Sequence, residues 1–331
     1  MTHGSSMVAF LALGAWMLCV PAAASQVAPE TSPSIGDALA RIQAMEPYQA
    51  TLFAKDLMAP DGLAFDPAGN LCVVVEGEGA VLLLPRSEEQ TPLVTDLHSP
   101  EALCFDPEGR LYVAEDGAGG RLMQRDREGT LSIIAQGLDA PEGVLFHDGV
   151  LYLTESDLQL VGEPTTARTR LLAFTLQEQG WSEAEVLVDR GFPLSFSEIV
   201  AVGKHSLILA NETAGGLITT GLLRYDRKTK TLTTFATGLV SPEGLCTTPT
   251  SDDGFPLYVA EEDIDGGGHG RISKVARDGT VTVFATGFQR IEDVLVDEEG
   301  VVHVSEDTTG WIVRLAPMKR LPADVGSGPS P

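Results

Sequence analysis

A short acidic motif recurs six times along the 331-residue chain, and this repeat constrains the fold more than any single residue does. Its clearest form is SPEGL at residues 241–245. The six copies read PDGL, PEAL, PEGV, SEIV, PEGL and IEDV, at residues 60–63, 100–103, 141–144, 197–200, 242–245 and 291–294. In this alignment an acid is the second residue of every copy. Such regular self-similarity indicates a repeat protein.

An apolar, alternating run follows each copy and ends in a polar residue 13 to 18 residues after the motif's acid. The runs are VVVE, YVAE, YLTE, ILAN, YVAE and HVSE, and their last residues are Glu76, Glu115, Glu155, Asn211, Glu261 and Glu306. Short alternating runs separated by Gly, Asp and Pro are typical of β-strands. Dipeptides such as Asp278-Gly279 are typical of hairpin turns. Each unit of roughly 40–55 residues is therefore predicted to contain four strands.

The two ends of the repeat region predict how the sheets close. The last unit has three predicted strands, at residues 294–296, 301–305 and 311–315, and no fourth. The apolar segment 52–55 precedes the first motif and can supply the missing strand. Closing the ring in this way removes exposed sheet edges. We therefore expect an all-β fold, a six-bladed β-propeller of four-stranded antiparallel blades over residues 48–317, in which an N-terminal strand completes the last blade.

The flanking segments suggest export. Residues 8–20 are almost wholly apolar and small residues follow them, which predicts a signal peptide at 1–24 and a secreted or periplasmic protein. The apolar stretch is shorter than a membrane span, so no membrane association is expected after cleavage. Residues 25–47 are predicted to be a linker with one short helix at 35–45, and residues 318–331 a disordered tail. We expect a monomer.

The chain is strongly acidic, with 47 Asp plus Glu against 22 Lys plus Arg. Nucleic-acid binding requires a basic face, so nucleic acid is not expected as a partner, whereas cations are. Three cysteines lie in strand patterns after the predicted cleavage site, at Cys72, Cys104 and Cys246. We expect them to be buried thiols, with a Cys72–Cys104 bridge as the alternative.

Strand direction predicts where the acids gather. The innermost strand of a blade leaves one face of the ring and the second strand returns to it, so both acid series should lie on the same face. The motif acids form a predicted inner circle, comprising Asp61, Glu101, Glu142, Glu198, Glu243 and Glu292. The residues that end the apolar runs form a second circle outside it. Asp116, Glu212, Glu262 and Asp307 follow the second circle and add to its charge.

Six converging carboxylates repel one another and must be protonated, paired with basic side chains or neutralised by a cation. Ca²⁺ accepts about 6–8 oxygen ligands in loose geometry, which suits such a set better than Mg²⁺ does. The inner circle is therefore our candidate site for Ca²⁺ or another divalent cation. The alternative is that these acids accept backbone N–H groups of neighbouring blades and merely close the channel.

The repeat, a Pro-acid-Gly-Leu strand followed by a strand such as LYVAE, resembles the gluconolactonase, regucalcin (senescence marker protein 30) and strictosidine synthase-like propellers, and also NHL repeats. The resemblance extends over residues 49–317. It implies a lactonase-type site with one divalent metal, usually Ca²⁺, on the channel axis, held by acids and asparagines at the start of inner strands. Asp61 and Glu243 match such positions in type. This chain differs in having no asparagine among its six motif acids, which leaves two metals or none as alternatives.

The resulting functional hypothesis is a secreted Ca²⁺-dependent hydrolase of a lactone or small ester. Water activation requires a base near the metal. The candidate bases are Glu115, Glu155, Glu261 and Glu306 of the second circle, and His98 and His269 in loops predicted on the same face. The alternative is a non-enzymatic scaffold whose acidic face binds a cationic ligand or protein. A third hypothesis, a metal-dependent phosphoesterase, would use the basic residues Arg168, Arg170, Arg271 and Arg290.

Overall fold

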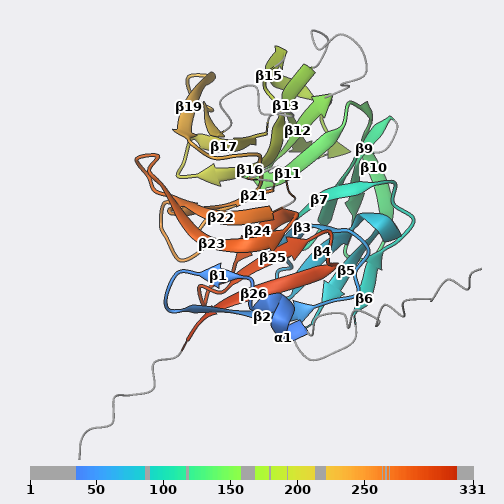
Figure 1. The fold of residues 1–331 in the computed structure, drawn as a ribbon. Helices are drawn as coiled ribbons and strands as arrows, with labels where there is room; N and C mark the ends of the chain where they lie inside the picture. Colours follow the sequence, from blue (N-terminus) through green and yellow to red (C-terminus); the bar gives the residue numbers. More distant parts are fainter. Residues whose placement is uncertain are drawn as a thin grey trace, which may run out of the picture.

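The first strand of each repeat contacts the first strand of the next, and the last of these, β24 (Ile291–Val296), contacts β3 (Pro60–Phe65), which closes a ring. The protein is described by a computed structural model, which covers residues 35–85, 90–116, 119–157, 168–178, 180–191, 193–212, 221–262, 264, 267 and 269–318. Six antiparallel sheets surround the central axis (Figure 1). The predicted six-bladed propeller is therefore confirmed.

Each blade is built from consecutive strands, numbered outward from the channel. Blades 1 to 3 contain β3, β4 (Leu71–Val75), β5 (Ala80–Leu84), β6 (Thr91–Val94); β7 (Pro100–Phe105), β8 (Leu111–Glu115), β9 (Gly120–Arg125), β10 (Leu131–Leu138); and β11 (Pro141–His147), β12 (Val150–Asp157), β13 (Arg168–Gln177), β15 (Glu185–Gly191). A short strand, β14 (Gly180–Trp181), pairs with the end of β13.

Blades 4 to 6 follow the same order. Their strands are β16 (Phe196–Val202), β17 (Ser206–Asn211), β18 (Gly221–Asp226), β19 (Thr231–Thr237); β20 (Pro242–Cys246), β21 (Leu257–Glu261), β22 (His269–Val275), β23 (Val281–Gln289); and β24, β25 (Val302–Glu306), β26 (Trp311–Pro317). One 3₁₀ turn, η1 (Glu76–Glu78), lies between β4 and β5.

The N-terminal segment completes the ring. Strand β2 (Tyr48–Ala54) pairs with β26 as the outer strand of blade 6, as the sequence predicts. The helix, in contrast, is shorter than expected: α1 covers Ile35–Leu39, and β1 (Gln43–Ala44) pairs with β23 of blade 5. Burial of Ile42 beside Phe284 and Phe288 favours this extended path. The predicted signal peptide and nearly all of the predicted tail lie outside the described residues.

The core lies between neighbouring blades rather than inside one sheet. One hydrophobic cluster, for example, joins Val74 and Val81 of blade 1 to Val113 and Met123 of blade 2. The second strands have apolar residues on both faces and are fully buried, because each is covered by a neighbouring blade on either side. The three described cysteines are free thiols, so the Cys72–Cys104 bridge is excluded. No helix among the described residues has the length and apolarity to cross a membrane.

Strand pairing corrects the repeat alignment in blade 4. In blade 1, Pro60 pairs with Val75 and Leu63 with Val73, and in blade 4 Phe196 pairs with Asn211 and Ile199 with Leu209. The residues equivalent to Asp61 and Gly62 are therefore Ser197 and Glu198. The prediction that an acid is the second residue of every copy is wrong in blade 4, because that motif lacks the Pro that marks the first position in blades 1, 2, 3 and 5.

A second correction concerns blade 1. Since Val75 pairs with Pro60 just as Glu115 pairs with Pro100, Val75 is the blade 1 equivalent of Glu115. Glu76 therefore belongs with the residues that directly follow the second strands, such as Asp116.

Candidate functional site: an acidic cavity at the channel mouth

A left-handed residue precedes the first strand in five of the six blades. These residues are Ala59, Ser99, Ala140, Ser241 and Arg290, with φ between 39° and 54°. The conformation is uncommon for residues other than Gly. Each carbonyl accepts a hydrogen bond at 2.8–3.0 Å from a backbone N–H at or just after the end of the second strand of the blade. The donors are Glu76, Asp116, Ser156, Glu262 and Asp307, of which Ser156 lies inside β12. This repeated turn holds those donors, four of them acids, at one mouth of the channel.

The glycine of the motif explains how closely the inner strands approach. A Cβ atom at Gly244 would lie 2.4 Å from Cα of Asp293, and one at Gly62 would lie 2.6 Å from the carbonyl oxygen of Glu101. Both distances are too short for a side chain. Because glycine fills the third position in blades 1, 3 and 5, the first strands of these blades approach their neighbours closely and bring the acids at the second position side by side.

These acids line a cavity of about 370 Å³, which we call the acidic cavity. Its lining includes eleven acidic side chains: Asp61, Glu76, Glu101, Glu142, Glu198, Glu212, Glu243, Glu262, Glu292, Asp293 and Asp307. All six predicted metal ligands are therefore brought together. Arg290 is the one basic side chain among the described lining residues. Its Nε atom lies 2.8 Å from Glu262 and 3.2 Å from Glu292, and its Nη1 atom 3.2 Å from Asp307.

Burial and mutual repulsion keep protons on these carboxyls. Burial, followed by the charge of Glu101 and a hydrogen bond to it, raises the pKa of Asp61 well above its usual range. Burial raises the pKa of Glu101 to about 8 and that of Glu292 to about 9. The pKa values of Glu142 and Glu243 are also raised, first by burial and then by neighbouring acids. The cavity therefore favours protons or bound cations over free carboxylates.

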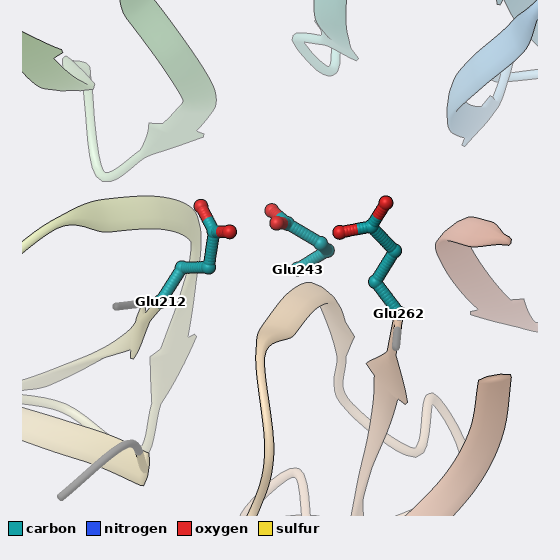
Figure 2. A group of neighbouring side chains, drawn as sticks. All are labelled: Glu212, Glu243 and Glu262. Carbon is teal, nitrogen blue, oxygen red and sulfur yellow. The ribbon is translucent and has the colours of Figure 1, made fainter. Parts of the chain in front are cut away.

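Three of the carboxyl groups are close enough to share one ion. Ligand oxygens of Glu212, Glu243 and Glu262 all lie within 4.8 Å of one another. Figure 2 shows Glu212 and Glu262 converging on Glu243, which lies between them. The sequence identified Glu243 as a ligand but treated Glu212 and Glu262 only as additional charge. The signal that could have found them is their place directly after the second strands of two adjacent blades.

The second-circle glutamates have a different environment from the acidic cavity. Glu115, Glu155, Glu261 and Glu306 are 0–1% exposed and each pairs with an arginine. Each also accepts a backbone N–H from the segment before the first strand, at 2.7–3.0 Å. The donors are His98, Asp139 and Val240 in loops and Gln289 at the end of β23, respectively. They lie outside the described lining of the cavity. Their oxygens join the loop to the blade.

Strand register matches each of these acids with its partner. Glu115, Glu155 and Glu261 pair directly with Arg121, Arg170 and Arg271 on the third strand. In blade 6 the paired residue is Trp311, and Arg41 from the N-terminal segment supplies the guanidinium, 2.6 and 2.7 Å from the two Glu306 oxygens. Where the second-strand residue is uncharged, the third-strand residue is small: Asn211 pairs with Gly221 and Val75 with Ala80.

The remaining candidates are placed as follows. His98 and His269 are exposed and lie outside the described lining of the cavity. Arg168 pairs with Asp189 on the surface. Arg170 and Arg271 bind second-circle glutamates, and Arg290 alone of the four arginines lines the cavity.

No protein-family model matches this sequence, and no curated protein matches it either. Solved structures, however, share the fold. A gluconolactonase from Xanthomonas campestris superimposes with a TM-score of 0.66 at 14% identity, over 82% of this chain and 91% of its own. A PQQ domain of pyranose dehydrogenase from Coprinopsis cinerea gives 0.59 at 11% identity, over 83% and 97%.

A third similar structure is a virginiamycin B lyase from Staphylococcus aureus, with a TM-score of 0.53 at 14% identity over 84% of this chain and 89% of its own. These three proteins are named for different chemistries, so the fold alone does not select one. A function for this protein must therefore be inferred from the acidic face of the ring. The architecture is thus that of the six-bladed propellers that include gluconolactonases, as the repeat motif indicates.

Proposed function

We propose that the protein is a divalent-metal-dependent hydrolase that opens a lactone or a small ester in the acidic cavity. The observation that carries this proposal is the convergence of Glu212, Glu243 and Glu262 in a cavity lined by eleven acids. Carboxylate oxygens are the ligands that Ca²⁺ prefers, and water can complete its coordination. When bound, such an ion polarises a substrate carbonyl as a Lewis acid.

A carboxylate elsewhere in the cavity supplies the base. Glu101 is the best candidate because its pKa of about 8 lies close to neutral pH, where a general base is most effective. The ionised Glu101 would take a proton from water as the water oxygen bonds to the carbonyl carbon. The carbon–oxygen bond of the ring then breaks, and the proton passes to the departing oxygen. The product from a lactone is a hydroxy acid, and an ester gives a carboxylic acid and an alcohol. The second-circle glutamates have no part in this step, because their oxygens already bind arginine and backbone N–H groups.

The composition of the lining favours a second candidate. Arg290 offers the one described positive charge against eleven acids. A non-enzymatic propeller that binds a cationic ligand or a basic segment of a partner protein would use the same electrostatic potential without any base.

The test combines metal binding with a substrate panel. Calorimetry with Ca²⁺ and with Mg²⁺ should show saturable binding to protein freed of metal by EDTA. Hydrolysis of γ- and δ-lactones and aryl esters should then depend on the bound ion. Glu243→Gln should weaken metal binding by about tenfold or more, because the number of charged ligands sets the affinity of a Ca²⁺ site. The same change should raise the melting temperature of the metal-free protein, because it removes repulsion among the three carboxyls.

Glu298→Gln is the matched control, since Glu298 is exposed in the turn between β24 and β25, at the other end of the blade. It should change neither quantity. Saturable metal binding without turnover of any substrate in the panel would favour the cation-binding scaffold. Absence of metal binding would overturn both the hydrolase and its metal site.

A further inference from the structure

A second cavity opens at the far ends of the innermost strands. Strand β3 illustrates the division, because Pro60, Asp61 and Gly62 line the acidic cavity whereas Leu63, Ala64 and Phe65 line the second one. The second cavity has a volume of about 280 Å³ and mainly apolar walls, so we call it the apolar cavity. Its described lining residues belong to blades 1, 2, 4, 5 and 6.

Two carboxyl groups form the boundary between the cavities. Glu198 and Asp293 line both of them. They occupy the third position of the motif in blades 4 and 6, where the other blades have Gly or Ala. The two acids therefore lie between a polar compartment and an apolar one.

The two acids are oriented by the same local hydrogen bond. Glu198 Oε1 accepts the N–H of Ile199 and Asp293 Oδ1 accepts that of Val294, both at 2.7 Å. Asp293 Oδ2 also accepts the N–H of Leu63 at 2.8 Å. Among the described residues, Glu198 Oε2 has no hydrogen-bond donor. One carboxylate oxygen therefore remains available to a ligand at the boundary.

No basic side chain among the described residues faces these acids in the apolar cavity. The described lining of the apolar cavity contains no Lys, Arg or His. Glu198 and Asp293 are the two carboxyl groups of that lining, and both lie at its boundary with the acidic cavity. The apolar cavity thus has two carboxyl groups at its inner end and mainly hydrocarbon along its walls.

We propose that the apolar cavity binds a small organic ammonium ion with an apolar body. The ammonium group would donate to Glu198, and the body would pack against Phe65, Phe105 and Leu295 of the lining. An inorganic cation fits less well, because these walls offer few oxygens to replace its water. A neutral apolar molecule would leave the buried carboxyl groups without a partner. This site shares Glu198 and Asp293 with the acidic cavity, but it does not depend on the proposed hydrolysis.

The test is calorimetry on the full protein in EDTA with benzylamine, benzyl alcohol and methylamine as probes. Benzylamine should bind, whereas benzyl alcohol lacks the charge and methylamine lacks the apolar body. Both should bind at least about tenfold more weakly, the amount expected for loss of a charge-assisted hydrogen bond or of a buried ring. Equal affinity for benzylamine and benzyl alcohol, or no binding of benzylamine, would overturn the proposal.

Variants locate the probe. Glu198→Gln keeps the shape of the boundary and should weaken benzylamine binding by about tenfold. Ala64→Leu fills the apolar cavity from its wall and should weaken it as well, which keeps the test decisive if either variant folds poorly. Glu262→Gln changes the acidic cavity alone and should leave the affinity for benzylamine unchanged. If Glu262→Gln weakens binding as much as Glu198→Gln does, the amine occupies the acidic cavity and the proposal is wrong.

Discussion

At the third position of the repeat, the neighbouring blade determines which side chain fits. Glycine occurs there in blades 1, 3 and 5, where an added Cβ would meet backbone atoms of the next first strand. Ala102 in blade 2 shows that a methyl group is accommodated at one such junction. Glu198 and Asp293 show that acids are accommodated at two others, where the side chain turns back to its own backbone.

Gly244→Ala should therefore destabilise the protein, because the new methyl group would overlap the backbone of Asp293 and force the two blades apart. We expect a loss of about 1–3 kcal/mol in the free energy of unfolding, the range for overpacked sites. Urea denaturation measures it. Ala102→Gly at the equivalent position is the control and should cost about 1 kcal/mol or less. A Gly244→Ala protein as stable as the wild type would show that the junction can widen freely.

At the scale of the strand, the buried second-circle glutamates connect the segment before the first strand to the rest of the blade through hydrogen bonds and ion pairs. Glu261 is the most completely bound, since it accepts from Arg271, from Ser273 and from the N–H of Val240. Blade 6 has the same arrangement with Arg41, which ties the N-terminal segment to the closing blade. The third-strand partner changes together with the second-strand residue, which indicates that these pairs are structural.

Glu261→Leu should destabilise the fold by about 3–5 kcal/mol, because it leaves the Arg271 guanidinium and the Val240 N–H without their acceptor. The double variant Glu261→Leu, Arg271→Met should recover part of that loss, since no charge is then stranded. Denaturant unfolding of the two single variants and the double variant completes the cycle. Arg168→Met removes an exposed pair with Asp189 and should cost less than about 1 kcal/mol. Additive changes in the free energy of unfolding at Glu261 and Arg271 would contradict this structural role of the pair.

For the whole molecule, the sequence predicts architecture better than it predicts the site. The period of the motif and the missing last strand were sufficient to predict six blades and their closure by β2, because both follow from strand count and edge pairing. The site depends on the register of single residues, and the β-bulge between the first and second strands of a blade makes this register hard to read from the sequence. In blade 4 the sequence alignment places Ser197 and Glu198 one position away from their structural register. The sequence also does not identify Glu212 and Glu262 as neighbours of Glu243, because only the fold brings adjacent blades together.

The acid-lined channel also predicts how the stability of the whole protein depends on pH. Free carboxyls titrate near pH 4 in an unfolded chain, whereas Glu101 and Glu292 do so at about 8 and about 9 in the folded protein. Between these limits the folded state binds more protons than the unfolded state. Stability in EDTA should therefore be highest at the acidic end of this range and should fall as the pH rises through the folded pKa values.

Divalent cations should oppose this loss, because they bind the ionised carboxylates of the folded state alone. We expect the rise in melting temperature produced by Ca²⁺ to be small near pH 5 and to increase toward pH 9. Thermal melting at a series of pH values, with EDTA or with Ca²⁺, measures both trends. Glu292→Gln should flatten the curve in EDTA, since it removes one of the groups whose pKa is raised by burial. A melting temperature in EDTA that stays level or rises with pH would contradict the assignment, because the acids would then be ionised and already compensated inside the protein.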